Sequence, residues 1–128
     1  LPPPPEKITS NLPVLQKALE AYKLWHGYHS AFPRLSKFSL GSKIDTLFTD
    51  FLELMLLAGY APADQKLPFI TKASTKLDLI KFFLQAAWEL KCFDHKKFAA
   101  VSLPLNEVGK MIGGWRKQAQ TKQTASMG

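Results

Sequence analysis

Apolar side chains recur every three or four residues in four separate stretches of the chain, and this spacing predicts four helices. Start and stop signals place the helices from Asn11 to Phe32, from Ser36 or Ser39 to Gly59, from about Lys66 to Lys91, and from Asp94 to Trp115. No useful stretch alternates with a period of two, and no Asn-Gly or Asp-Gly hairpin turn is present. We therefore expect an all-α fold, an up-down antiparallel four-helix bundle around one core.

The last helix carries the clearest pattern. Its apolar positions follow Asp94, a natural N-cap, and alternate by three and four without a break: Phe98, Val101, Leu105, Val108, Ile112 and Trp115. Pro104 lies inside this pattern, and because the register continues across it we expect a kink rather than two helices. Trp115 precedes Arg116 and Lys117, but its place in the stripe favours core packing over stacking on a base.

The two ends of the chain lack this pattern. Residues 1–11 include four consecutive prolines, which supply no backbone donors, and are expected to form a flexible proline-rich arm. Residues 118–128 are polar and rich in small side chains, and are expected to form a disordered tail. The bundle domain is then residues 12–117.

Two of the predicted helices carry more apolar surface than one bundle needs. Residues 51–58 have one charged residue in eight, and residues 79–88 extend the apolar stripe well beyond the core-facing positions. A wide core with a few exposed apolar residues is the simpler interpretation. Because two consecutive helices share the surplus, we favour an apolar face for subunit packing, hence a homo-oligomer. The candidate interface residues are Leu54, Leu56, Leu57, Leu79, Phe82 and Phe83.

The charge balance favours a polyanionic partner, since 17 Lys and Arg stand against 10 Asp and Glu and leave a formal charge of +7. In an up-down bundle most of these cations gather at the two ends, and those that we expect to bind nucleic acid are Arg34, Lys37, Lys43, Lys91, Lys96, Lys97, Arg116 and Lys117. Only two of the 17 are Arg, which favours phosphate contacts over base reading. Lysines that serve only solubility are the alternative.

The sequence offers no catalytic or metal-binding constellation. His26 and His29 share a helix face, but a di-iron bundle site needs Glu-x-x-His motifs and the chain has none, so we expect histidines that are satisfied or face solvent. Cys92 is the only cysteine, which fits a reducing compartment and excludes an intrachain disulfide. No apolar run approaches the ~20 residues that span a bilayer, and no signal peptide is visible. We expect a cytoplasmic protein that is not an enzyme and has no cofactor, metal or membrane contact.

Three stretches resemble one bundle family: Phe38–Asp45 followed by Phe51–Leu54 and Ala61, Lys76–Phe82, and Asn106–Trp115. Together they are similar to the accessory variability determinant (Avd) proteins of diversity-generating retroelements, over about residues 14–117. The closing Glu-Val-Gly-x-x-x-Gly-x-Trp is the most specific piece.

This resemblance implies a bacterial or phage-encoded four-helix bundle that assembles as a barrel-shaped homopentamer with a basic surface. It further implies binding to the retroelement's reverse transcriptase and to RNA or DNA, in support of mutagenic retrohoming. The alternative is an oligomeric protein-binding scaffold of the related ribosomal-RNA intervening-sequence type, without a nucleic-acid function.

Overall fold

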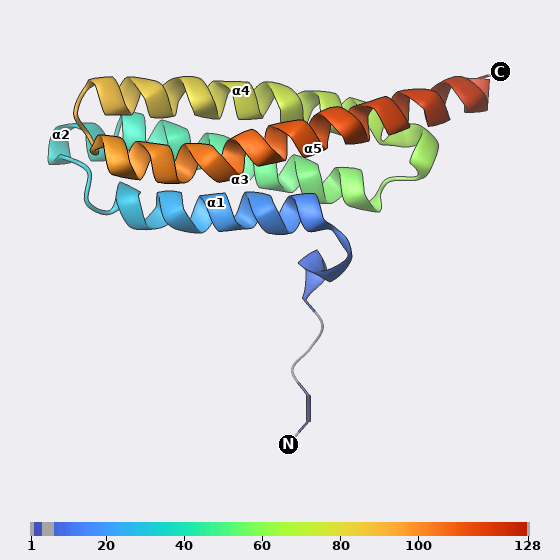
Figure 1. The fold of residues 1–128 in the computed structure, drawn as a ribbon, viewed down its shortest axis with the longest axis horizontal. Helices are drawn as coiled ribbons and strands as arrows, with labels where there is room; N and C mark the ends of the chain where they lie inside the picture. The colour runs from blue at the N-terminus through green and yellow to red at the C-terminus, as the bar shows by residue number, and fades with distance from the viewer. Residues whose placement is uncertain (1, 4–6, 128) are drawn as a thin grey trace.

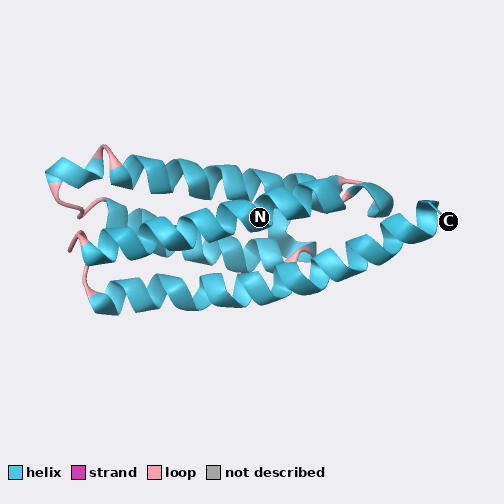
Figure 2. Ribbon diagram, turned by 90° about the horizontal axis from the view of Figure 1, so that it is seen from above, coloured by secondary structure: helices cyan, strands magenta, loops and turns pink. Residues whose placement is uncertain are grey.

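The computed structural model describes residues 2–3 and 7–127, and four long helices account for most of them. They lie antiparallel, with short connections at both ends of the bundle (Figures 1 and 2). The long helices are α1 (Pro13–His29), α3 (Leu40–Tyr60), α4 (Leu67–Glu89) and α5 (His95–Met127), and the shorter elements are η1 (Ile8–Asn11), α2 (Arg34–Lys37) and η2 (Ala63–Gln65). The described residues contain no strand, and the predicted all-α class is confirmed.

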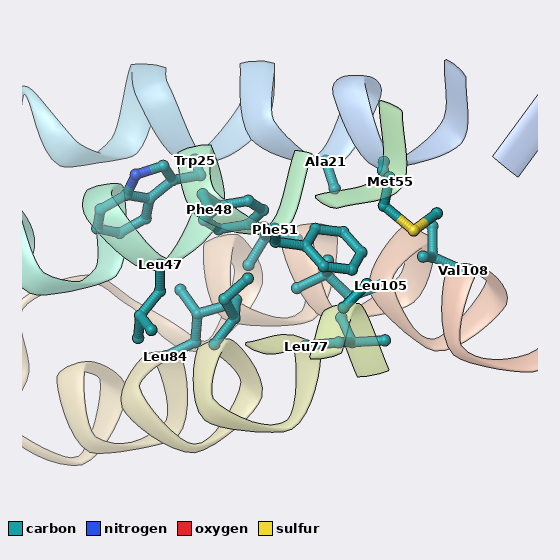
Figure 3. Packing of buried hydrophobic residues seen from close by; sticks show 14 of the residues in the cluster. Ala21, Trp25, Leu47, Phe48, Phe51, Met55, Leu77, Leu84, Leu105 and Val108 are labelled. Carbon is teal, nitrogen blue, oxygen red and sulfur yellow. The ribbon is translucent and has the colours of Figure 1, made fainter. Parts of the chain in front are cut away.

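The helices surround one core because each buries one apolar stripe. Helices α1 and α4 each pack against both α3 and α5. Fully buried side chains from all four helices meet along the bundle axis, among them Trp25, Phe48, Phe51, Met55 and Leu105 (Figure 3). Burying a large apolar side chain contributes about 1.5–3 kcal/mol, so this interior is the main source of stability.

Local signals explain where the helices begin. The backbone N–H of Lys97 donates a hydrogen bond of 2.9 Å to the Asp94 carboxylate, which caps α5 as predicted. Of the two predicted starts of α3, Ser36 and Ser39, the structure has Ser39 at the N-cap, without a capping hydrogen bond from its side chain. Helix α1 begins at Pro13 with Leu12 at the N-cap, so the expectation that this helix starts at Asn11 is wrong. Helix α5 runs through Pro104 as one helix.

The expected tail after Lys117 is also wrong, because α5 continues as helix to Met127 (Figure 1). Ala119 is buried against the core, and the Ser126 hydroxyl donates a hydrogen bond of 3.1 Å to the Asp64 carboxylate of η2. These contacts with η2 supply the tertiary support that the polar sequence alone does not indicate. Of the expected arm, residues 1 and 4–6 lie outside the described residues, and Ile8–Asn11 form the 3-10 turn η1.

Candidate nucleic-acid interface

One end of the bundle collects the turns that join α1 to α3 and α4 to α5, and we call it the α2 end (left in Figure 1). Helix α2 and the first turns of α3 and α5 lie there. The antiparallel order of the helices therefore brings together six of the eight cations predicted to bind nucleic acid: Arg34, Lys37, Lys43, Lys91, Lys96 and Lys97.

The six cations at the α2 end are available to a ligand. Four are exposed, and the other two lie beside aromatic rings, with Lys37 Nζ 5.8 Å from the Phe38 ring centroid and Lys97 Nζ 5.8 Å from that of Tyr28. In the described part of the chain none of the six forms an ion pair. Lys17, elsewhere on the bundle, forms ion pairs instead, and its hydrogen bond to Glu107 raises the pKa of the Lys17 ammonium.

Two of the three acidic residues at this end are bonded to the protein's own donors. The Asp45 carboxylate accepts hydrogen bonds from the Tyr22 hydroxyl at 3.0 Å and from Trp25 Nε1 at 3.2 Å. Asp94 caps α5, which leaves only Glu89 without such a role. Burial, followed by the hydrogen bond and the charge of Asp45, raises the pKa of Tyr22. Asp45 and Asp94 thus stabilise the bundle, while the six cations are exposed or half-buried at its surface.

A hydrogen bond from α1 anchors the turn that carries Lys37. His29 Nε2 lies 3.0 Å from the Lys37 carbonyl oxygen, and because that oxygen only accepts, Nε2 is the donor. The His29 ring also stacks on Trp25, with centroids 5.0 Å apart and planes at 13°. Gly41 of α3 approaches this ring so closely that a Cβ atom there would lie 2.5 Å from His29 Nε2. His29 thus contacts both α2 and α3 from α1, which fixes these three helices relative to one another.

The turn between α4 and α5 presents Lys91 in an unusual backbone conformation. Lys91 has a φ of 61°, in the left-handed region where glycine is favoured. Its N–H donates to the Trp88 carbonyl at 2.9 Å, and the N–H of Cys92 donates to that of Ala87 at 2.8 Å, which ends α4 in a Schellman motif. A lysine here costs about 1 kcal/mol relative to a residue without this restriction.

Aromatic side chains form a continuous packed layer beneath the α2 end. Neighbouring ring centroids are 5.3, 5.5, 6.1 and 4.8 Å apart, distances typical of favourable edge and stacked pairs. The layer joins both turns to the core, since two of its members lie in the connections between helices. In order of contact its residues are Trp25, Phe32, Phe93, Phe98 and Trp88.

Comparison with known proteins decides the family. A family model described as bAvd-like matches residues 14–119, a span that takes in α1, α3, α4 and most of α5. The chain belongs to the bAvd-like family. This match supports the accessory role implied by the resemblance to Avd proteins, a family of accessory proteins that is not known as an enzyme family. A comparison with curated proteins found no match.

The other two predicted cations of the bAvd-like chain, Arg116 and Lys117, lie apart from the six, toward the opposite end of the bundle. Lys117 is exposed and Arg116 is half-buried. Lys66, on the same end, has a structural role: its Nζ donates to the Ala58 and Gly59 carbonyls at 2.8 and 3.1 Å and so caps the end of α3.

Trp115 also has a structural environment, as predicted from its place in the apolar stripe. Its ring is half-buried against the core, and Lys66 Nζ lies 5.9 Å from the ring centroid. The ring lines a groove together with Ala63, Gln118 and Lys122. Because Lys66 bonds to the end of α3 and lies over this ring, the opposite end offers fewer cations to a ligand than the α2 end.

The six apolar residues predicted to form the subunit interface of a homo-oligomer divide into two groups by exposure. Leu57, Leu79 and Phe82 are exposed, and Phe82 is the most accessible at 62%. Leu54, Leu56 and Phe83 are half-buried against their own core. Leu54 and Leu57 line a groove between α3 and α4, whereas Leu56 lines a separate hollow with Leu12 and Tyr60. The structure thus places Leu56 on the α1 side of α3, away from this groove.

Two large apolar residues between α1 and α3 are exposed, and neither was predicted to belong to a site. Leu35 and Phe38 are 92% and 74% exposed. The signal was present in Pro33-Arg-Leu-Ser-Lys-Phe38, where basic and apolar residues are interleaved in a segment too short to bury its apolar side chains.

The histidines lie where the sequence analysis expected them. His29 is hydrogen-bonded, and His26 and His95 are exposed. Across the residues that the structure describes, no three His, Cys, Asp or Glu side chains gather as metal ligands would. Within the same part of the chain, no helix has both the length and the apolar character needed to cross a membrane.

Proposed function

We propose that this bAvd-like protein is a non-enzymatic accessory subunit of a diversity-generating retroelement. It assembles as a homopentamer, binds RNA or DNA, binds the reverse transcriptase, and supports mutagenic reverse transcription and retrohoming. The observation that carries the nucleic-acid part is the α2 end, where six cations with no ion pair within the described residues lie on α2, on the turn between α4 and α5, and on the first turns of α3 and α5.

The physical mechanism is the release of counterions from the phosphate backbone. Each phosphate that a lysine or arginine neutralises releases condensed cations, so the affinity falls linearly with salt on a log–log scale. The slope is about −0.9 per contact on duplex DNA and about −0.7 on a single strand. An oligomer repeats the α2 end several times, and linked weak contacts add through effective concentration.

The backbone at Lys91 supports a role for this charge. A left-handed φ disfavours any side chain relative to glycine, yet a cation occupies the position. Strained residues that persist in a fold are candidates for function.

Charge reversal tests the site. Replacing Arg34, Lys37 and Lys43 by Glu is expected to lower affinity for labelled RNA and DNA sharply and to flatten the salt dependence. Helicity and oligomer size stay unchanged, because none of these side chains belongs to the core. Binding is measured by fluorescence anisotropy at several salt concentrations.

A matched variant with the same change in net charge separates the α2 end from a general charge effect. Arg116, Lys117 and Lys122 are replaced by Glu at the opposite end, and a much smaller loss is expected there. If only this second variant loses binding, the site lies at the opposite end. If both variants bind as tightly as the parent, the lysines serve solubility and the protein is a protein-binding scaffold.

Light scattering tests the assembly. The purified chain is expected to scatter as a pentamer of its 14.4 kDa mass, and Phe82→Ser is expected to dissociate it while helicity is retained. Leu103→Ser is the control, because Leu103 on α5 is 64% exposed, close to the 62% of Phe82. A monomeric parent at micromolar concentration contradicts the proposal, and dissociation by the Leu103 variant alone moves the interface to α5.

Copurification tests the protein partner. When the chain is expressed together with the reverse transcriptase of its retroelement, the two are expected to elute together after nuclease treatment. Loss of the pair on nuclease treatment would show that nucleic acid alone connects them.

A further inference from the structure

A large aromatic side chain stands in solvent at the α2 end. Phe38 follows α2 directly, and its side chain is 74% exposed. Phenylalanine is usually among the most buried residue types. The aromatic layer below is already complete without it, since none of the five rings in that layer contacts Phe38. The fold therefore does not account for a ring at this position.

The surroundings of Phe38 are cationic and conformationally fixed. Lys37 Nζ lies 5.8 Å from the ring centroid, and Arg34 and Lys43 flank the same turn. The backbone next to the ring is held by the hydrogen bond from His29 to the Lys37 carbonyl, and the Ser39 hydroxyl donates to the Leu35 carbonyl at 3.2 Å. A ring on a fixed turn has less conformational freedom to lose when it binds a ligand.

An exposed ring beside phosphate-binding cations fits one kind of nucleic acid better than another. In a duplex the faces of the bases are covered by their neighbours, so an external ring contacts only the backbone or a groove. In a single strand each base has a free π-face, and proteins that bind single strands combine a basic surface with aromatic side chains on which bases stack. Such stacking tolerates any sequence.

We infer that Phe38 is a stacking platform for an unpaired base, and that the α2 end takes single-stranded RNA or DNA in preference to duplex. This inference rests on the proposed nucleic-acid function and specifies the class of ligand at the same site. The cations neutralise phosphates, and the ring selects strands whose bases are free.

Three labelled probes of equal length test this inference: a single strand, its duplex, and an abasic strand that has the same phosphates but no bases. The parent protein is expected to prefer the single strand over both the duplex and the abasic strand. Phe38→Ala is expected to weaken single-strand binding by about 5- to 150-fold. Its affinity for the duplex and the abasic strand, and its salt slope, should match those of the parent, because its cations are intact.

Leu35 provides the matched control. It lies three residues before Phe38 and is 92% exposed, but has no π-face. Leu35→Ala is expected to bind the single strand like the parent, whereas Phe38→Leu is expected to bind like Phe38→Ala. Circular dichroism and light scattering check that all variants keep their helicity and oligomer size, as expected for exposed positions.

Four outcomes would overturn the inference in distinguishable ways. Equal losses of Phe38→Ala on all three probes would mean that the ring only positions the neighbouring cations. Unchanged strand binding, together with loss of reverse transcriptase copurification in both Leu35→Ala and Phe38→Ala, would identify a protein-docking surface. A parent that binds the single strand and the abasic strand equally, with Phe38→Ala silent, removes stacking but leaves the proposed function intact. A parent that binds no probe refutes the proposed nucleic-acid function itself.

Discussion

Replacing Gly41 by alanine is expected to destabilise the bundle at the contact that holds the α2 end. Gly41 is buried in the first turn of α3, and an added Cβ atom would lie 2.5 Å from His29 Nε2 and 2.6 Å from His29 Cδ2. The imidazole has little room to move, because Trp25 stacks on it at 5.0 Å and Phe32 lies edge-on at 5.9 Å. Either the ring shifts or α3 moves away from α1.

The magnitude follows from the interactions that a shifted His29 would lose. Its hydrogen bond to the Lys37 carbonyl contributes about 0.5–1.5 kcal/mol. Its stacking on Trp25 contributes a further ~0.5–1.5 kcal/mol. Alanine regains up to ~1 kcal/mol over glycine in a helix interior, and less in a first turn. We expect a net loss of about 1–2 kcal/mol in the free energy of unfolding, and a melting temperature lower by roughly 3–8 °C.

Thermal and urea unfolding followed by circular dichroism measure this change, at one fixed chain concentration because assembly contributes to stability. Gly27→Ala is the control: Gly27 is exposed on α1, and nothing lies within 4 Å of its added Cβ. That variant is expected to gain about 0.5–1 kcal/mol. In a His29→Ala background the Gly41 substitution should cost much less, since the obstructing ring is gone. A Gly41→Ala variant as stable as Gly27→Ala would refute the close approach of α1 and α3.

Two further predictions concern polar contacts that the charge pattern alone does not reveal. Lys66→Gln is expected to lower the free energy of unfolding by about 1–2 kcal/mol and to leave nucleic-acid binding unchanged, because Lys66 caps the Ala58 and Gly59 carbonyls. The control is Lys72→Gln, at an exposed lysine on the same end, which should change stability by less than about 0.5 kcal/mol. Equal effects of the two substitutions would contradict the capping role. Tyr22→Phe is expected to lower the free energy of unfolding by about 1 kcal/mol at neutral pH. Because the pKa of Tyr22 is raised in the fold, the extra stability of the parent is complete below the usual tyrosine pKa of about 10 and is lost as the pH rises through the raised pKa. A gap between parent and Phe variant that stays constant into strong alkali would contradict the hydrogen bond to Asp45.

The helices, their order and most of their bounds were predictable because the signals that specify them are local. The stripe from Val101 to Ile112 and the Asp94 cap are read within a few residues of the positions that they determine. The gathering of six cations at one end was predictable as well, since four antiparallel helices with short connections leave one arrangement of their ends.

What could not be predicted depends on contacts between distant residues. Leu54, Leu56 and Leu57 lie in an uninterrupted apolar run, so hydropathy alone cannot show which side of α3 each residue faces. Only the packing of α1 and α4 against α3 places Leu56 on a different side from Leu54 and Leu57. The helix after Lys117 depends on η2, which supplies the Ser126 contact from 62 residues away. The capping role of Lys66 could not be predicted either, because no sequence signal pairs a lysine with carbonyls seven and eight residues earlier.

The α2 end separates the groups that stabilise it from the groups that face solvent. Aromatic rings, the Asp45 carboxylate and the His29 imidazole make the contacts that fix the two turns, whereas the six cations make no ion pairs within residues 2–3 and 7–127. Cations crowded at one end repel each other, and Lys91 adds the cost of a left-handed backbone. Neither the repulsion between the cations nor the left-handed backbone at Lys91 is required for a stable bundle. An external polyanion relieves the repulsion, which is why the variant with Glu at positions 34, 37 and 43 is expected to lose binding while it keeps, or slightly gains, stability.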